Sequence, residues 1–232
     1  MTRLRPKTRG IGEAKANIGA AVVVYNRYDL LPECLEKLYA NYWKPAETLI
    51  VDNGRQLDPA TIKKFPVRII TPEARIALAA AWNLIFREVP REQILLLNDD
   101  AFLSGGSVQL LSDAAQRPNS GAAAINGNWG AVLITRKLYE LIGPFDENFW
   151  PAWHEDDDWR VRMRLADRRV IHVIDSQYRH IDHGTQLAMS PEEREQFNRW
   201  REEGREYYIR KWGDRPGHEI FMVPFNGAND GA

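Results

Sequence analysis

The stretch from Gln93 to Asp100, "QILLLNDD", decides how this chain is organised. Its four consecutive apolar residues predict a buried strand, and Asn98, Asp99 and Asp100 lie at the carboxyl end of that strand. In open α/β sheets, ligands bind in the crevice beyond the carboxyl ends of the strands. The stretch therefore predicts an interior strand with a polar site at its end.

The segments around this stretch alternate between short apolar runs and longer runs with helical spacing. Strands are expected at 18–25, 47–54, 67–72 and 93–100, and helices at 26–43, 73–89 and 107–116. Such alternation predicts an α/β fold with a Rossmann-like parallel sheet and helices on both faces. No GxGxxG motif follows the first strand, which counts against a dinucleotide ligand.

The second half of the chain is less regular until its final helix. A strand and a short helix are expected within 130–149, a helix from 158 and a strand at 170–175. The final helix has clear boundaries: Ser190 can cap it, Pro191 suits its first turn, Glu193 completes a capping box and Gly213 suits its end.

Composition excludes several classes of function. The chain has 232 residues with 32 acidic and 31 basic side chains, so no overall charge favours nucleic acid or a membrane surface. Cys34 is the single cysteine, which excludes an internal disulfide and suits a cytoplasmic protein. It is expected to be a buried structural thiol. The basic start of the chain (Arg3, Arg5, Lys7, Arg9) lacks the apolar core of a signal peptide, and no apolar run is long enough to span a bilayer.

Two interpretations of Asp99 and Asp100 stand about equal on spacing alone. Carboxylates at a strand end suit Mg²⁺ or Mn²⁺, which bind oxygen ligands together with substrate phosphates. Aspartates are also common where they cap a loop and the helix that follows.

A second acidic cluster lies in "WHEDDDW", residues 153–159. Acidic residues at the start of a helix are favoured by the helix dipole, which explains part of the cluster. The flanking tryptophans are typical of sugar-binding clefts, and they can desolvate an acid and tune its pKa for general-base catalysis. Farther along the chain, His180 and His183 could supply a nitrogen ligand to the same metal.

The order of these motifs resembles family 2 glycosyltransferases of the GT-A fold. The resemblance runs from about Ala20 to Thr185, through "VVVYNRYDLLPECLEKL", "LIVDNG", "ILLLNDDAFL" and "GAVLITRKLYELIGPFDENFWPAWHEDDDWRVRMR". The tail "YYIRKWGDRPGHEIFMVPF" resembles a C-terminal extension of some bacterial and phage members. The resemblance implies a mixed, mostly parallel sheet with helices on both faces.

The resemblance also implies roles for individual residues. Asn98-Asp99-Asp100 takes the place of the DXD motif, and Glu155-Asp156 matches the pair whose aspartate acts as catalytic base. A metal, Mn²⁺ or Mg²⁺, would be held by Asp100 with His180 or His183. The residues expected at the donor are Tyr25, Asn26, Arg27, Asp52, Asn83, Asn98 and Asp99, and those expected at the acceptor are Trp153, Asp157 and Trp129.

We therefore expect an inverting, metal-assisted glycosyltransferase that uses a nucleoside diphosphate sugar, of the UDP or dTDP type by default. The acceptor could be a saccharide, a glycolipid, a protein or a modified DNA base. The alternatives are a non-catalytic nucleotide- or sugar-binding module and a nucleotidyltransferase, although the first strand lacks the glycine-rich phosphate loop of the latter.

The chain is expected to divide into four segments. We expect a flexible basic tail at 1–17, a donor-binding half at 18–117, an acceptor and catalytic half of the same domain at 118–188, and a C-terminal helix and tail at 189–232. We expect no integral membrane contact.

Overall fold

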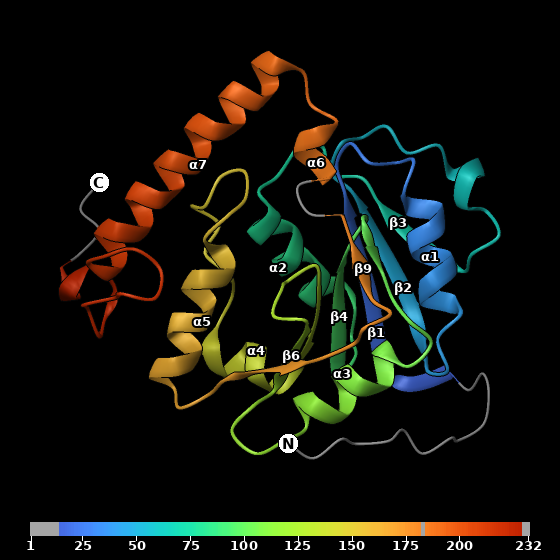
Figure 1. The fold of residues 1–232 in the computed structure, drawn as a ribbon, viewed down its shortest axis with the longest axis horizontal. Helices are drawn as coiled ribbons and strands as arrows, with labels where there is room; N and C mark the ends of the chain where they lie inside the picture. The colour runs from blue at the N-terminus through green and yellow to red at the C-terminus, as the bar shows by residue number, and fades with distance from the viewer. Residues whose placement is uncertain (1–13, 182–183, 229–232) are drawn as a thin grey trace.

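The computed structural model describes residues 14–181 and 184–228, and a mixed sheet forms its centre (Figure 1). Within those residues seven strands pair in the order β3-β2-β1-β4-β7-β6-β8. Their bounds are β1 Ala14–Val24, β2 Lys44–Asp52, β3 Val67–Ile70, β4 Gln93–Asn98, β6 Ala122–Ile125, β7 Ala131–Thr135 and β8 Val170–Val173. A small two-stranded sheet pairs β5 (Ala101–Phe102) with β9 (Arg179–His180).

Helices cover both faces of the large sheet, as the alternating pattern predicts. The helices are α1 Leu31–Tyr39, α2 Leu78–Glu88, α3 Ser107–Ala115, α4 Arg136–Ile142, α5 Glu155–Leu165, α6 Gly184–Leu187 and α7 Pro191–Trp212, with 3₁₀ turns η1 at Pro59–Ile62 and η2 at Pro224–Gly227. Leu35 of α1 and Val108 of α3 pack on one face, where Cys34 is also buried. Ile85 of α2 and Trp159 of α5 pack on the other face.

Strand β4 lies at the centre of the sheet, where the pairing of neighbouring strands changes from parallel to antiparallel. It runs parallel to β1 and antiparallel to β7, with Leu96 opposite both Ala21 and Val132. The expected mixed, mostly parallel sheet is therefore confirmed. Because β7 is antiparallel, the loop that precedes it, which contains Asn128 and Trp129, lies at the carboxyl end of β4, and Asn98 N donates to Gly130 O at 2.9 Å.

The observed elements differ from the sequence expectations in several places. Strand β1 begins at Ala14, so residues 14–17 are strand and not tail. Helix α2 begins at Leu78 and not at 73, because the Asn53 side chain exchanges two hydrogen bonds with the backbone of Ile76 and holds that segment out of the helix. Helix α5 begins at Glu155, so it contains the acidic cluster as well as the segment expected from 158. Strand β6 was not expected from its alanine-rich sequence.

Helix α7 matches its expected boundaries closely. The Ser190 hydroxyl accepts from Glu193 N at 3.2 Å, the Glu193 carboxylate accepts from Ser190 N at 2.8 Å, and Gly213 ends the helix with a φ of 85°. The helix lies beside α5 along one edge of the molecule (Figure 1). Tyr208 and Trp212 of α7 form a small core there with Phe149 and Val161.

Candidate functional site

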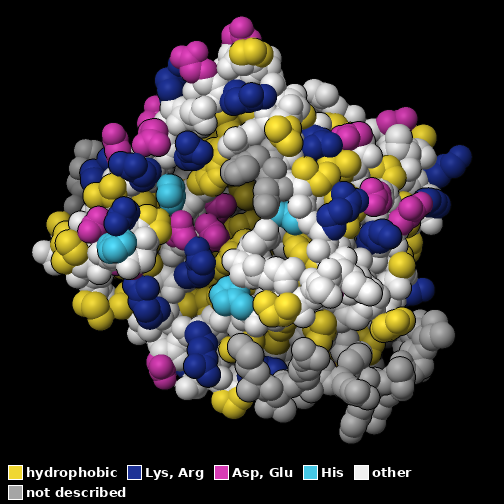
Figure 2. Space-filling view, viewed as in Figure 1, with side chains coloured by type: hydrophobic (Ala, Val, Ile, Leu, Met, Phe, Trp, Pro, Cys, Tyr) yellow, Lys and Arg dark blue, Asp and Glu magenta, His cyan; other side chains and the backbone are white. Residues whose placement is uncertain are grey.

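A cavity of about 380 Å³ lies at the carboxyl ends of β1, β2 and β4. Figure 2 shows a hollow near the centre of this face, with acidic and hydrophobic side chains on its wall. The lining includes Tyr25, Asn53, Arg75, Asn98, Asp99, Asp100, Asn128, Trp129, Trp153, Glu155, Asp156, His180, Gln186 and Phe197. The topology thus brings both acidic clusters of the sequence to one cavity.

Asp100 and His180 face each other at the end of β4. The pairing of β5 with β9 places Ala101 opposite His180, and Nε2 of His180 lies 3.0 Å from Oδ1 of Asp100. Both side chains are mostly buried, at 6% exposed for Asp100 and 14% for His180. His183 lies outside the described residues, so the structure does not place it.

Asp99 is buried beside Asp100, and this environment favours its neutral form. Burial, followed by the neighbouring charge of Asp100, raises the pKa of the Asp99 carboxyl to about 8, and Arg27 opposes this shift. Two adjacent buried carboxylates without a full set of partners are costly, which is typical of a functional site.

Glu155 and Asp156 form the start of α5 on the other wall. Burial raises the pKa of the Asp156 carboxyl to about 6, with the charge of Asp157 as the next cause, and Arg160 opposes the shift. The Asp156 side chain keeps 23% of its surface exposed and lines the cavity. Burial also raises the pKa of Glu155 well above its usual value. Asp156 is therefore the carboxylate that is accessible and tuned for proton transfer.

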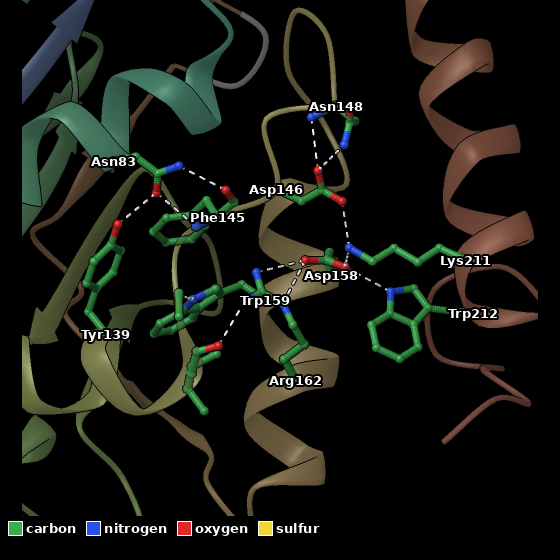
Figure 3. Close-up of polar contacts among 12 residues, drawn as sticks. Asn83, Tyr139, Phe145, Asp146, Asn148, Asp158, Trp159, Arg162, Lys211 and Trp212 are labelled. Atoms are coloured by element: carbon green, nitrogen blue, oxygen red, sulfur yellow. Dashed lines mark hydrogen bonds and ion pairs between the residues drawn. The ribbon is translucent and has the colours of Figure 1, made fainter. Parts of the chain in front are cut away.

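The other two acids of the cluster turn away from the cavity. The Asp157 carboxylate contacts His154 Nδ1 at 3.2 Å and pairs with Arg160, so its expected contact with an acceptor has no support in this geometry. Asp158 is fully buried and is bonded by Arg162, Lys211 and Trp212 (Figure 3). Neither residue lines the cavity.

Four residues of the cavity wall each bury a polar atom that has no hydrogen-bond partner in the part of the chain that the structure describes. These atoms are Oδ1 of Asp100, Nε1 of Trp129, Oε2 of Glu155 and Nε2 of Gln186. Buried polar atoms in folded proteins are nearly always bonded. Their concentration around one cavity indicates a site that is complete only with a polar ligand.

Residues 20–148, more than half of the chain, match the sequence model of the family described as Glycosyl transferase family 2. The chain belongs to this family. The match ends before α5, so Asp156 and the C-terminal helix lie outside it. The likeness of that tail to a bacterial or phage extension stays a prediction.

A curated relative supports the assignment to glycosyl transferase family 2. The uncharacterized glycosyltransferase YwdF of Bacillus subtilis (strain 168) is 27% identical over 139 residues, which are 56% of this chain and 52% of the relative. The chain thus spans about half the length of this curated relative.

Solved structures share the GT-A fold of this family 2 chain. The mannosyltransferase PcManGT from Pyrobaculum calidifontis, in complex with GDP-Man and Mn²⁺, has a TM-score of 0.60 and 14% identity over 79% of this chain and 64% of that one. The glucosyl-3-phosphoglycerate synthase from Mycobacterium tuberculosis, in complex with Mn²⁺, UDP and glucosyl-3-phosphoglycerate, has a TM-score of 0.63 and 10% identity over 87% and 82%. At these identities the likeness shows the fold alone.

Only some of the residues that the family resemblance assigns to the donor line the cavity. Tyr25, Asn98 and Asp99 line the cavity. Asn26 and Arg27 contact the backbone of α6. Asn26 Nδ2 donates to Thr185 O at 3.0 Å, and Arg27 Nη1 donates to Gly184 O at 3.1 Å. They hold the segment that covers this end of the cavity.

Asp52 and Asn83 stabilise loops and do not line the cavity. Asp52 accepts from the Tyr28 hydroxyl at 2.7 Å and from backbone amides of the turn after β2. Asn83 donates to Phe145 O and Glu147 Oε1 and accepts from Tyr139 and from Phe145 N, which uses every hydrogen-bonding position of its amide (Figure 3). This geometry gives no support to the expected contact of Asn83 with the donor.

Arg75 is the functional candidate that the sequence interpretation missed. Its guanidinium lies 3.9 Å from the ring centroid of Tyr25, donates to the Tyr25 hydroxyl at 3.0 Å and is surrounded by Trp150, Phe197 and Trp200. No ion pair to Arg75 occurs among the described residues, and burial lowers its pKa. Its position beyond the carboxyl end of β3 was the available signal.

Proposed function

We propose that this chain is an inverting glycosyltransferase that moves a sugar from a nucleoside diphosphate sugar to an acceptor hydroxyl. The observation that carries the proposal is the meeting of two acidic walls in one cavity, with Asp100 at the end of β4 and the accessible Asp156 at the start of α5. Membership of glycosyl transferase family 2 and the nucleotide sugars bound by fold neighbours support it.

In the proposed reaction, Asp156 removes the proton of the acceptor hydroxyl. The hydroxyl oxygen attacks the anomeric carbon while the bond between that carbon and the diphosphate oxygen breaks, and the electron pair leaves with the diphosphate. A single displacement of this kind inverts the anomeric configuration. Trp153 and Phe197, whose ring centroids are 4.5 Å apart, would supply an aromatic wall for the acceptor ring.

Residues present in the chain fit a divalent metal such as Mn²⁺ or Mg²⁺. Asp100 offers a buried carboxylate oxygen that has no hydrogen-bond partner among the described residues, and such metals are held by one or two carboxylates together with substrate phosphates. No cluster of three or more histidine, cysteine, aspartate or glutamate side chains suited to a metal occurs among the described residues, so the diphosphate would complete the site. When bound, the metal supplies positive charge near the leaving diphosphate.

The donor side of the cavity would bind the nucleotide through Tyr25, Asn98 and Arg75. Fold neighbours were solved with UDP and with GDP-Man, so uridine, thymidine and guanosine diphosphate sugars are the donors to test first. The acceptor class stays as expected from the sequence: a saccharide, a glycolipid, a protein or a modified DNA base. Among the described residues, none of the helices has the length and apolar character needed to cross a bilayer.

Thermal stability in the presence of nucleotides tests this proposal. The melting temperature is measured with UDP, dTDP, GDP and their sugars, each with Mn²⁺, Mg²⁺ or EDTA. A ligand that binds only the native state raises the melting temperature by mass action. We expect a metal-dependent rise with one nucleoside diphosphate class. No rise with any member of the panel would contradict the proposed donor site.

A further inference from the structure

The hydrogen bonds of Asn128 fix the tautomer of His180. Oδ1 of Asn128 accepts from Gly130 N at 2.6 Å, and a backbone N–H can only donate, so the oxygen must face Gly130. Nδ2 of Asn128 then faces Nδ1 of His180 at 2.8 Å. Because an amide NH₂ can only donate, Nδ1 must be the acceptor and carries no proton. The proton of the neutral imidazole therefore lies on Nε2.

This tautomer conflicts with metal ligation by His180. Nε2 is the nitrogen that lies on the cavity side, 3.0 Å from Oδ1 of Asp100, and a nitrogen that carries a proton has no lone pair for a metal. Histidines that bind metals usually donate their other N–H to a carboxylate, a carbonyl or water. Here the other nitrogen faces a donor instead, so the surroundings of the ring are the reverse of those in a metal site.

Tight packing keeps this arrangement in place. A Cβ atom at Gly130 would lie 2.8 Å from both Oδ1 of Asn128 and Nε2 of His180, so the glycine allows the close approach of the backbone. Asn98 Nδ2 is 3.5 Å from the same Nε2, which is beyond the usual range of hydrogen bonds and does not decide the tautomer.

We propose that His180 is a hydrogen-bond donor to the diphosphate of the donor substrate and not a metal ligand. Nε2–H of His180 and Oδ1 of Asp100 lie side by side on the cavity wall, 3.0 Å apart. This pair suits a nucleotide with its metal, because the N–H can donate to a phosphate oxygen and the carboxylate can bind a cation. This inference rests on the proposed function for its ligand, and it differs from the expectation that His180 helps to hold the metal.

Two measurements on the wild-type protein test the inference directly. Long-range ¹⁵N–¹H NMR of the histidine rings at about pH 8, above the ordinary pKa of imidazole, reports which nitrogen carries the proton. We expect the Nε2–H form for His180, and an Nδ1–H form would overturn the inference without any metal or nucleotide present. Electron spin echo spectroscopy of Mn²⁺ with UDP or GDP should then show no directly bound imidazole nitrogen. A directly bound nitrogen that is absent in His180→Gln would equally overturn it.

A reversed hydrogen bond provides a gain-of-function test. In Asn128→Asp the carboxylate accepts from both Gly130 N and Nδ1–H, which moves the proton and leaves Nε2 able to bind metal. We expect the Nδ1–H tautomer, a new Mn²⁺–nitrogen coupling and roughly tenfold tighter Mn²⁺ binding, in line with the effect of such outer partners. Asn126→Asp is the matched control, because Asn126 lies on the same loop but bonds to Asp175 and should change none of these. An unchanged His180 tautomer in Asn128→Asp contradicts the inference.

The experiment separates this inference from the proposed function. If Mn²⁺ fails to bind wild-type protein with any nucleoside diphosphate, the metal part of the proposed function fails, while the NMR tautomer still decides the role of Asn128. If nucleotide and Mn²⁺ bind and the imidazole nitrogen is coordinated, the proposed function stands and the inference fails. His180→Gln should weaken UDP or GDP binding while Mn²⁺ affinity in the presence of that nucleotide changes less.

Discussion

Lys211 Nζ lies 2.6 Å from Oδ1 of Asp158, and this contact joins the C-terminal helix α7 to the helix that begins with Glu155 and Asp156. The same ammonium group lies 2.6 Å from Oδ2 of Asp146, and both Lys211 and Asp158 are buried (Figure 3). Helix α7 therefore does more than cover the domain, because it neutralises the buried acid two residues after Asp156.

Replacing Lys211 with Met should lower the free energy of unfolding by about 3–5 kcal/mol, because it leaves Asp158 and Asp146 without their shared cation. Urea denaturation of the purified protein measures this. The control is Arg199→Met on the same helix, whose exposed pair with Glu195 should contribute less than about 1 kcal/mol. Similar stability losses in the two variants would show that the buried contact has no special weight.

Much of the fold could be predicted because its signals are local. The apolar run before Asn98 and Asp99 marks a strand and its end, and the ends of α7 are set by side chains within one turn of Ser190 and Gly213. Both features depend on neighbours in sequence. The α/β class and the acidic cavity wall follow from such signals.

The remaining parts of the site depend on contacts between distant segments. The antiparallel direction of β7 brings Asn128 to His180, and nothing in the sequence near either residue indicates that pairing. The sequence does not distinguish Asp158 from the other acids of its cluster, whereas its burial is decided by Lys211 and Trp212 on another helix. No local sequence motif marks Arg75, because its aromatic surroundings come from three separate segments.

Replacing Asp156 with Asn should abolish turnover while leaving the nucleotide site intact. General-base catalysis contributes about 10²–10⁴ to the rate, and the amide cannot accept the acceptor's proton. Steady-state kinetics and calorimetric binding of the donor nucleotide measure the two properties. Asp157→Asn is the matched control, since Asp157 contacts His154 and Arg160 and not the cavity, and it should lose much less activity. Full turnover in Asp156→Asn would rule out its role as the base.

The pH dependence of the reaction should report the same carboxylate. Because burial raises the pKa of Asp156 to about 6, kcat/KM should fall below that pH as the base becomes protonated. Protonation of Asp156 does not itself destabilise the folded state. A raised pKa means that the folded state binds this proton more tightly between about pH 4 and 6, so this group's contribution to stability decreases as pH rises through that window. A rate that stays constant from about pH 7 to 5 would contradict the assignment.

Replacing Arg75 with Met should weaken nucleoside diphosphate binding about 10- to 100-fold. Hydrogen bonds to charged groups contribute about 1.5–3 kcal/mol, and Arg75 lines the cavity without a carboxylate partner among the described residues. Arg75→Lys should be intermediate, because an ammonium group keeps the charge but not the planar stacking on Tyr25. Isothermal titration with UDP and GDP measures the affinity, and circular dichroism verifies that each variant is folded.

The control is Arg117→Met, which changes an exposed arginine on a distant groove and should bind nucleotide like the wild-type protein. Wild-type affinity in the Arg75→Met variant would mean that the guanidinium only stabilises the aromatic residues around it.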